Sequence, residues 1–227
     1  MAGGAAAGEG AAAALRGFML ADSVVTDQAE YDLYRGAVLP SVEEHGGRFI
    51  IRGGRFEVLE GAREWHRLIG LEFGSYAAMD GWYRSPHYQE LKAQRLKGAR
   101  TDMVFVEETA SRGGGGVIAG PEPAPPAPGT APAYVIADFV IHDLDAVKPY
   151  VEGVAATHAG HGSRYLSRGG RVEAAEGEWR PSRLILIQFP SFEGALAWYR
   201  SDAYQALARI RQAASRTEMV VVEGHVS

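Results

Sequence analysis

The 227-residue sequence contains no cysteine, which excludes disulfides, thiolate nucleophiles and zinc or iron–sulfur sites held by thiolates. It also lacks an excess of basic residues, since it has 23 Lys and Arg but 28 Asp and Glu, and the net charge is −5 at pH 7. Because phosphate binding needs clustered Lys and Arg, we expect no nucleic-acid partner. No apolar run approaches the ~18 residues of a membrane span and no basic amphipathic stretch is present, so we expect no membrane partner.

The start of the chain, MAGGAAAGEGAAAALRG, lacks two kinds of targeting signal. It has neither the basic n-region of a secretory signal nor the Arg and Ser richness of a transit peptide. We therefore expect a disordered Ala/Gly tail over residues 1–14 of a cytoplasmic protein. Hydrophobic residues make up 46% and charged residues 22% of the chain, which is typical of a globular protein.

What the sequence does contain is a duplication. Residues 161–177 read HGSRYLSRGGRVEAAEG, and residues 45–61 read HGGRFIIRGGRFEVLEG. The offset, 161 − 45 = 116, holds without a gap over residues 17–108, with about 35 of 92 paired positions identical. The duplication predicts a first module at residues 15–108 and a second module at residues 133–227. The Gly/Pro-rich residues 109–132 are a predicted linker, long enough at ~3.1 Å per residue in its Pro-rich half to let the modules pair.

Each module has the same predicted order of elements. Residues 17–26 and 133–142 are apolar, β-branched strands, and residues 29–44 and 143–159 are helices that end at a glycine. The strand beginning at Arg48 alternates, so Arg48, Ile50 and Arg52 are predicted to share one face. Gly53-Gly54 are interpreted as a bulge inside one long strand rather than as a turn.

The second half of each module continues with a strand, a two-piece helix and a closing strand. Ser75 and Ser191 are predicted N-caps, and Ser85-Pro86 is a helix start that divides the helix of the first module. The closing strands are predicted at residues 103–106 and 219–222. The resulting order, strand, helix, strand, strand, helix, strand, is the split βαβ pattern of an α+β ferredoxin-like module.

The motifs HGGRYLxRGG…EVLEG, W-R-P-x-R-L, F-P-S-F, W-Y-x-S-x-x-Y-Q and V-V-x-E-G resemble a small bacterial-type family, the domain of unknown function numbered 1330. The second module matches better, with residues 179–183 and 189–192 intact, whereas the first departs at residues 63–67 and 73–76. The resemblance implies the dimeric α+β barrel superfamily, with two four-stranded sheets facing each other and both supplied by this chain. It brings no established activity, although the superfamily includes cofactor-independent monooxygenases, haem-degrading enzymes, and dehalogenase-like and isomerase-like enzymes.

Polar residues present in both modules are the candidates for chemistry. His45 and His161 can exchange a proton near neutral pH, or they can serve as helix C-caps. The recurring arginines are Arg48 with Arg164 and Arg52 with Arg168. They can hold a carboxylate bidentately, or they can form ion pairs with glutamates of the same stretch, Glu60/Glu176 or Glu57/Glu173.

Recurring aromatic residues lie at the junction in the two-piece helix. They are Tyr83 and Tyr88 in the first module and Tyr199 and Tyr204 in the second. Their rings can belong to the core, or their hydroxyls can line the mouth of a pocket between helix and sheet. Arg95 and Arg211 are expected on a solvated helix face.

Two hypotheses follow. The first is a cofactor-independent enzyme, or a binder, of a small anionic or carbonyl-bearing organic molecule, whose site lies in the second module. Its residues are His161 as the catalytic group and Arg164, Arg168, Tyr199 and Tyr204 as substrate-binding groups, with His45, Arg48, Arg52, Tyr83 and Tyr88 as their first-module equivalents. The second is a non-catalytic module in which these residues serve the fold and the interface between modules.

Neither a cofactor nor a metal is expected. The pair His158 and His161 has helical spacing, but no third ligand accompanies it and the first module has Val42 in place of His158. Pairing of the two modules within one chain is the expected assembly, and a homo-oligomer is left open. The sequence does not decide whether the protein is an enzyme.

Overall fold

The computed structural model describes residues 14–109 and 129–226. The first module contains β1 (Gly17–Val25), α1 (Gln28–Glu44), β2 (Gly47–Arg52), β3 (Phe56–Glu60), β4 (Arg67–Phe73), α2 (Tyr76–Arg84), α3 (Pro86–Gly98) and β5 (Ala99–Glu107). The second contains β6 (Ala133–Ile141), α4 (Lys148–Gly153), the 3-10 helix η1 (Val154–His158), β7 (Arg164–Arg168), β8 (Val172–Glu176), β9 (Leu184–Phe189), α5 (Phe192–Arg200), α6 (Asp202–Ala214) and β10 (Ser215–Glu223). The predicted tail and linker lie largely outside the described residues. None of the described helices is both long and apolar enough to cross a bilayer.

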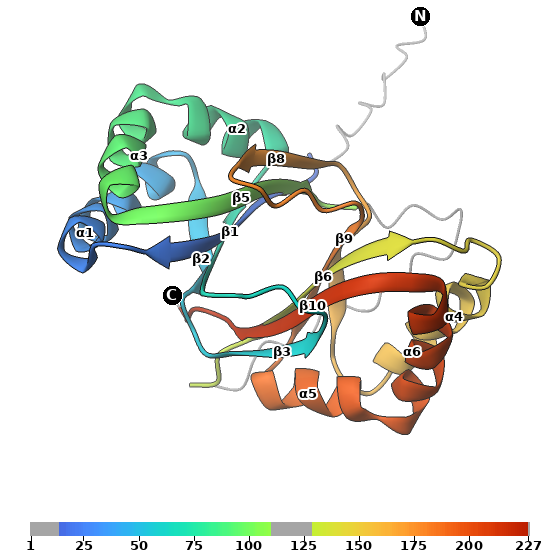
Figure 1. Ribbon diagram of the computed structural model, residues 1–227. Coiled ribbons are helices and arrows are strands. Elements are labelled where there is room, and N and C mark those ends of the chain that lie inside the picture. Colours follow the sequence, from blue (N-terminus) through green and yellow to red (C-terminus); the bar gives the residue numbers. More distant parts are fainter. Residues whose placement is uncertain (1–13, 110–128, 227) are drawn as a thin grey trace, which may run out of the picture.

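The strands form two antiparallel sheets of five strands, in the orders β2-β4-β1-β5-β8 and β3-β10-β6-β9-β7. The sheets face each other and the helices cover their outer sides (Figure 1). Each sheet takes one strand from the other module, because β8 pairs with β5 and β3 pairs with β10. The two modules therefore pair within one chain, and the exchange adds a fifth strand to each expected four-stranded sheet.

The interpretation of Gly53-Gly54 as a bulge inside one strand is wrong. β2 ends at Arg52 in one sheet, and β3 begins at Phe56 in the other. Gly53 has a φ of 72°, in the left-handed region that glycine adopts without strain. A Cβ on Gly54 would lie 2.6 Å from the carbonyl oxygen of Glu223, so the chain crosses between the sheets where only glycine fits.

A bulge does occur inside β2, before Gly53, and it changes which side chains of the strand share a face. The register of β2 on β4 shifts between Phe49 and Ile51, so Arg48 lies opposite Glu72 while Arg52 lies opposite Ile69. Since the extra residue reverses the alternation of the strand, Arg48 and Arg52 point to opposite faces of the sheet. The prediction that they share a face is wrong for this reason.

Three clusters of buried residues make up the core. One fills the space between the sheets, where Phe18 and Leu20 of β1 meet Tyr134 and Ile136 of β6. The other two lie between each sheet and its own helices. Residues of both modules form the inner cluster. Its apolar surface is therefore buried only when the two sheets pair.

A buried ion pair holds each exchanged strand. Arg95 of α3 is 2% exposed and contacts Glu176 of β8 at 2.8 Å, and Arg211 of α6 is 1% exposed and contacts Glu60 of β3 at 2.5 Å. The expectation that these two arginines lie on a solvated face is wrong. They are buried because the exchanged strand covers them, which the order of elements along the chain does not reveal.

The first helix differs between the modules. α1 is a continuous helix of 17 residues, close to the predicted residues 29–44, and Asp27 caps its start. The helix expected at residues 143–159 is replaced by a turn, the six-residue α4 and η1. Asp143 accepts from the backbone N–H groups of Asp145 and Ala146 in the turn, and α4 then begins at Lys148 with Pro149 in its first turn. The prediction of one long helix is wrong, because the turn at Asp143 delays the start of α4 to Lys148 and the chain tightens into η1 from Val154.

Candidate functional site

The second module contains a cavity of about 260 Å³ between α4, η1 and the outer face of its sheet. Its walls are mostly apolar. Ala137, Ile185 and Met219 line it from the sheet, and Val147, Tyr150 and Val154 line it from the helical side. A concave apolar space with few polar groups is the usual form of a small-molecule site.

The first module has the same cavity in reduced form, about 30 Å³ in volume. Arg52, Arg67 and Arg95 line it at the positions that Arg168, Arg183 and Arg211 occupy in the second module, 116 residues later. Val147, however, corresponds to Tyr31, whose ring is 3% exposed and packs at 5.8 Å from the ring of Tyr34. The tyrosine and the unbroken α1 therefore fill the space that the short α4 leaves open.

Positive charge gathers along the second-module cavity. The charged side chains that line it are Lys148, Arg168, Arg183, Arg211 and Glu152. Glu60 neutralises Arg211, and Asp145 contacts Lys148 at 2.7 Å. Arg168 donates to the carbonyl of Val151 at 3.3 Å and lies over the ring of Tyr165, 5.1 Å from its centroid. The arginines give this wall of the cavity an attraction for anions.

His158 makes a polar cluster beside the cavity that sequence reasoning missed. Its Nδ1 lies 2.7 Å from the Ser163 hydroxyl and its Nε2 lies 2.9 Å from the hydroxyl of Tyr165, a lining residue. Burial, with smaller contributions from Arg168 and His161, lowers the pKa of His158 from 6.5 to about 4. The imidazole is therefore neutral at pH 7, with one donor and one acceptor nitrogen.

The histidines predicted from the duplication do not line the cavity. His45 is the C-cap residue of α1, with its Nδ1 3.0 Å from the carbonyl oxygen of Ser41, as the helix-cap alternative predicts. His161 lies in the turn after η1, where its backbone N–H donates to the carbonyl of His158. The structure thus places His161 beside the polar cluster but outside the cavity lining.

Arg164 and Arg168 are separated by the bulge that β7 shares with β2. The register on β9 shifts between Tyr165 and Ser167, so Arg164 lies opposite Gln188 and Arg168 opposite Ile185. As in β2, this shift places the two arginines on opposite faces of the sheet. Arg168 faces the cavity, and Arg164 faces the space between the sheets.

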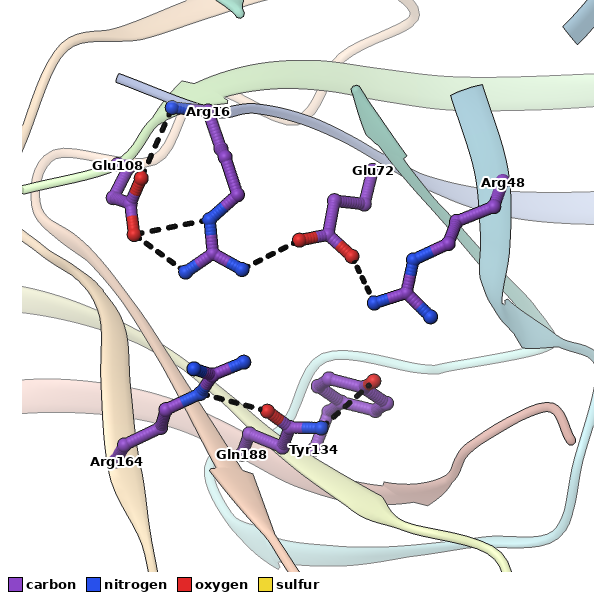
Figure 2. Close-up of polar contacts among 7 residues, drawn as sticks. All are labelled: Arg16, Arg48, Glu72, Glu108, Tyr134, Arg164 and Gln188. Carbon is purple, nitrogen blue, oxygen red and sulfur yellow. Dashed lines mark hydrogen bonds and ion pairs between the residues drawn. The ribbon is translucent and has the colours of Figure 1, made fainter. Parts of the chain in front are cut away.

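Figure 2 shows the surroundings of Arg164. Its Nε donates to Gln188 at 2.9 Å, and across the gap between the sheets Arg16 bridges Glu72 and Glu108. Arg48 contacts the same Glu72. Burial opposes the charge of Glu108, but the hydrogen bonds and charge of Arg16, with a smaller contribution from Arg164, lower its pKa. This cluster joins charges of both modules and lies apart from the cavity.

The tyrosines predicted to line a pocket mouth instead contact the exchanged strands and the core. Tyr199 donates to the Leu59 carbonyl at 3.0 Å, and Tyr83 donates to Glu176 at 3.0 Å. Tyr88 and Tyr204 are fully buried, with ring centroids 4.0 and 4.1 Å from those of Trp82 and Trp198. None of these four tyrosines lines the second-module cavity, whereas Trp198 does.

No metal centre is evident in the part of the chain that the structure describes, because three His, Cys, Asp or Glu side chains nowhere gather there. The arrangement of basic, apolar and hydrogen-bonding groups suits an organic ligand better than a cation.

Two facing antiparallel sheets with helices outside, built from two ferredoxin-like modules, define a dimeric α+β barrel in a single chain. The family model of the Domain of unknown function (DUF1330) matches it twice, at residues 16–109 and 132–225, and the chain belongs to that family as a tandem pair. No curated protein matches the sequence.

Several solved structures share the fold. A dye-decolorizing peroxidase from Bacteroides thetaiotaomicron VPI-5482 aligns with a TM-score of 0.55 at 10% identity, covering 92% of each chain. A mutant chlorite dismutase from Candidatus Nitrospira defluvii aligns with a TM-score of 0.54 at 8% identity, covering 93% of this chain and 92% of the other. An anthrone oxidase-like protein aligns with a TM-score of 0.50 at 12% identity, covering 93% of this chain and 92% of the other. At these identities the likeness establishes the fold alone.

Proposed function

We propose that the second module binds a small organic molecule with an apolar body and an anionic or carbonyl-bearing end, in the cavity beneath α4. The observation that supports this most is the contrast in volume, about 260 Å³ against about 30 Å³ at the same place in the first module. Since an apolar cavity of about 150 Å³ accepts benzene, the larger one has room for a ring and a polar substituent.

The lining suggests how such a ligand is oriented. Its apolar body packs against Ile185, Met219 and the ring of Trp198, and its anionic group meets Arg168 and Arg183. Arg168 is the member of the sequence-predicted set that enters this proposal. A guanidinium beside a largely apolar space binds a carboxylate more strongly than it would in water.

Four of the residues that both modules share support the second hypothesis for their own role. Arg95, Arg211, Tyr83 and Tyr199 all contact the exchanged strands. They serve the fold and the interface between modules, and their recurrence therefore does not indicate two ligand sites.

Calorimetric titration with phenylacetate and its neutral analogue phenylacetamide tests the proposal. We expect phenylacetate to bind the wild-type protein more tightly than the amide, and Arg168→Ala to weaken phenylacetate binding by about tenfold or more, because a charged hydrogen bond contributes ~1.5–3 kcal/mol. Arg52→Ala, the matched change in the first module, should leave the affinity unchanged. Equal losses in both variants, or no binding of either compound, would contradict the proposal.

A second variant tests the cavity itself. Val147→Tyr places in the second module the side chain that Tyr31 contributes to the first, and it should abolish phenylacetate binding by filling the space. Circular dichroism controls for folding. Undiminished binding in this variant would show that the compound binds elsewhere.

A further inference from the structure

A hydrogen-bonded row connects the interior of the second module with the cavity. It runs from the Ser163 hydroxyl through the imidazole of His158 to the hydroxyl of Tyr165, over contacts of 2.7 and 2.9 Å. The His158 ring is stacked on Trp198 at 4.8 Å with an interplanar angle of 21°, which fixes its orientation. Tyr165 and Trp198 both line the cavity, so the row ends at the ligand space.

The neutral imidazole allows two arrangements of protons along this row. In the first, His158 donates from Nδ1 to Ser163 and accepts at Nε2 from Tyr165. In the second, Ser163 donates to Nδ1, His158 donates from Nε2 to the Tyr165 oxygen, and the Tyr165 O–H is left to donate into the cavity. Burial raises the pKa of Tyr165, so the phenol keeps its proton in either arrangement.

The first module folds without any part of this row. Val42, Gly47 and Phe49 stand where His158, Ser163 and Tyr165 stand in the second module. Although Val42 lies in α1 and His158 in η1, β2 pairs with β4 just as β7 pairs with β9, so the sheet of the module does not need the three polar groups. Burying a polar group costs free energy, and the hydrogen bonds that it forms only offset this cost. Three polar groups beside the larger cavity are therefore not explained by stability of the fold.

We propose that Tyr165 is the specificity-determining residue of the cavity and donates a hydrogen bond to a carbonyl oxygen of the ligand. This proposal rests on the function proposed above. His158 and Ser163 are its positioning residues, which hold the second arrangement of protons. The guanidinium of Arg168 lies 5.1 Å from the centroid of the Tyr165 ring, so both groups serve one end of the ligand. The ligand class is a small apolar molecule with a carboxylate next to a carbonyl, as in an aromatic 2-oxo acid.

Benzoylformate and phenylacetate provide a matched pair of probes, since both carry one ring and one carboxylate and only benzoylformate has the keto oxygen. In calorimetric titration we expect the wild-type protein to prefer benzoylformate by about two- to tenfold, the range of one neutral hydrogen bond. Tyr165→Phe, which installs the first-module residue, should remove this preference and leave phenylacetate affinity unchanged.

The positioning role is tested by the same affinity ratio. His158→Val installs the first-module residue and should bring the ratio close to one, while His158→Gln, whose amide can still donate to Tyr165, should restore part of it. A merely structural role for His158 would lower both affinities together and leave the ratio unchanged, which would overturn this part of the inference.

The outcomes separate this inference from the function on which it rests. If phenylacetate binds in the cavity but Tyr165→Phe keeps the wild-type preference, or if the wild-type protein shows no preference, Tyr165 does not contact the keto oxygen and the inference alone is wrong. If neither probe binds the wild-type protein, the proposed function is wrong and the inference falls with it.

Discussion

The two modules have the same fold but differ under the first helix. In the first module α1 runs unbroken for 17 residues and Tyr31 fills the space beneath it. In the second, the six-residue α4 and Val147 leave a cavity of about 260 Å³. Beside that cavity the second module has the hydrogen-bonded pair His158 and Tyr165, where the first module has the apolar residues Val42 and Phe49.

The contrast distinguishes two kinds of residue in this duplicated chain, those that both modules share and those at which the modules differ. Positions that both modules keep, such as Arg95 and Arg211, hold the exchanged strands. Positions at which the modules differ, such as Val147 and His158, set the size of the cavity and the hydrogen bonds beside it, although the shared Arg168 also lines it. The structural role of the first group and the proposed ligand role of the second can be tested separately.

The largest effect is expected from the residues that the modules share. Arg211→Leu leaves Glu60, whose side chain is 10% exposed, buried without its cation, and should lower the free energy of unfolding by ~3–5 kcal/mol. Arg95→Leu should have an effect of similar size through Glu176. Urea denaturation measures both.

An exposed ion pair is the control for this prediction. Arg55 contacts Glu193, and the two side chains are 54% and 69% exposed, so Arg55→Leu should cost less than ~1 kcal/mol. The double change of Arg211 and Glu60 to leucine should recover much of the lost stability. A small effect of Arg211→Leu alone would contradict a structural role for the shared arginines.

A second comparison concerns Tyr31 and Val147, which decide how full each cavity is. Tyr31→Val removes a buried ring and should lower the free energy of unfolding by about 2–4 kcal/mol, because the first module then contains a void. Val147→Tyr fills an existing space and should cost less than Tyr31→Val. Denaturant unfolding of both variants checks the difference, and equal losses would mean that the second-module space is not open to a tyrosine.

Much of this fold could be predicted from the sequence. The gapless repeat, the caps at Ser75 and Ser191 and the split helix at Ser85 all appear where local patterns place them. The strand exchange could not be predicted, because Gly53-Gly54 permits a bulge, a turn or a crossing to another sheet, and only packing between modules decides among these. The same applies to the burial of Arg211, which depends on a strand about 150 residues earlier in the chain.

The candidate site was harder to predict, for two physical reasons. The bulge in β7 reverses the alternation of side chains, so Arg164 and Arg168 cannot be placed on one face or two from spacing alone. Residues present in both modules are also the natural candidates for chemistry, and His158, which has no histidine counterpart in the first module, stands out from the sequence only as a potential metal ligand. The available signal is the opposite one: within eight positions, a valine, a glycine and a phenylalanine of the first module stand where the second has His158, Ser163 and Tyr165.

The smallest predicted effect is a pH dependence specific to the second module. The pKa of His158 in the folded protein is about 4, below its ordinary value of 6.5, so the unfolded chain takes up the proton first as pH falls. Stability that is present above pH 6.5 is therefore lost on acidification toward pH 4. Between pH 6.5 and 5.5 the wild-type free energy of unfolding should fall by about 1 kcal/mol more than that of His158→Gln.

Val42 offers the matched control, because Val42→Gln changes the equivalent first-module position without removing a titrating group. Its pH profile between 6.5 and 5.5 should run parallel to that of the wild-type protein. If His158→Gln also runs parallel, His158 is not buried as a neutral group.

The most direct test of the difference between the modules is a heteronuclear NMR titration of the labelled protein with phenylacetate. The account predicts chemical-shift changes at backbone amides along the second-module cavity, such as Ala137, Val151 and Ile185, and none at their first-module counterparts Ala21, Arg35 and Ile69. Equal changes in both modules, or changes confined to the residues around Arg164 between the sheets, would contradict it.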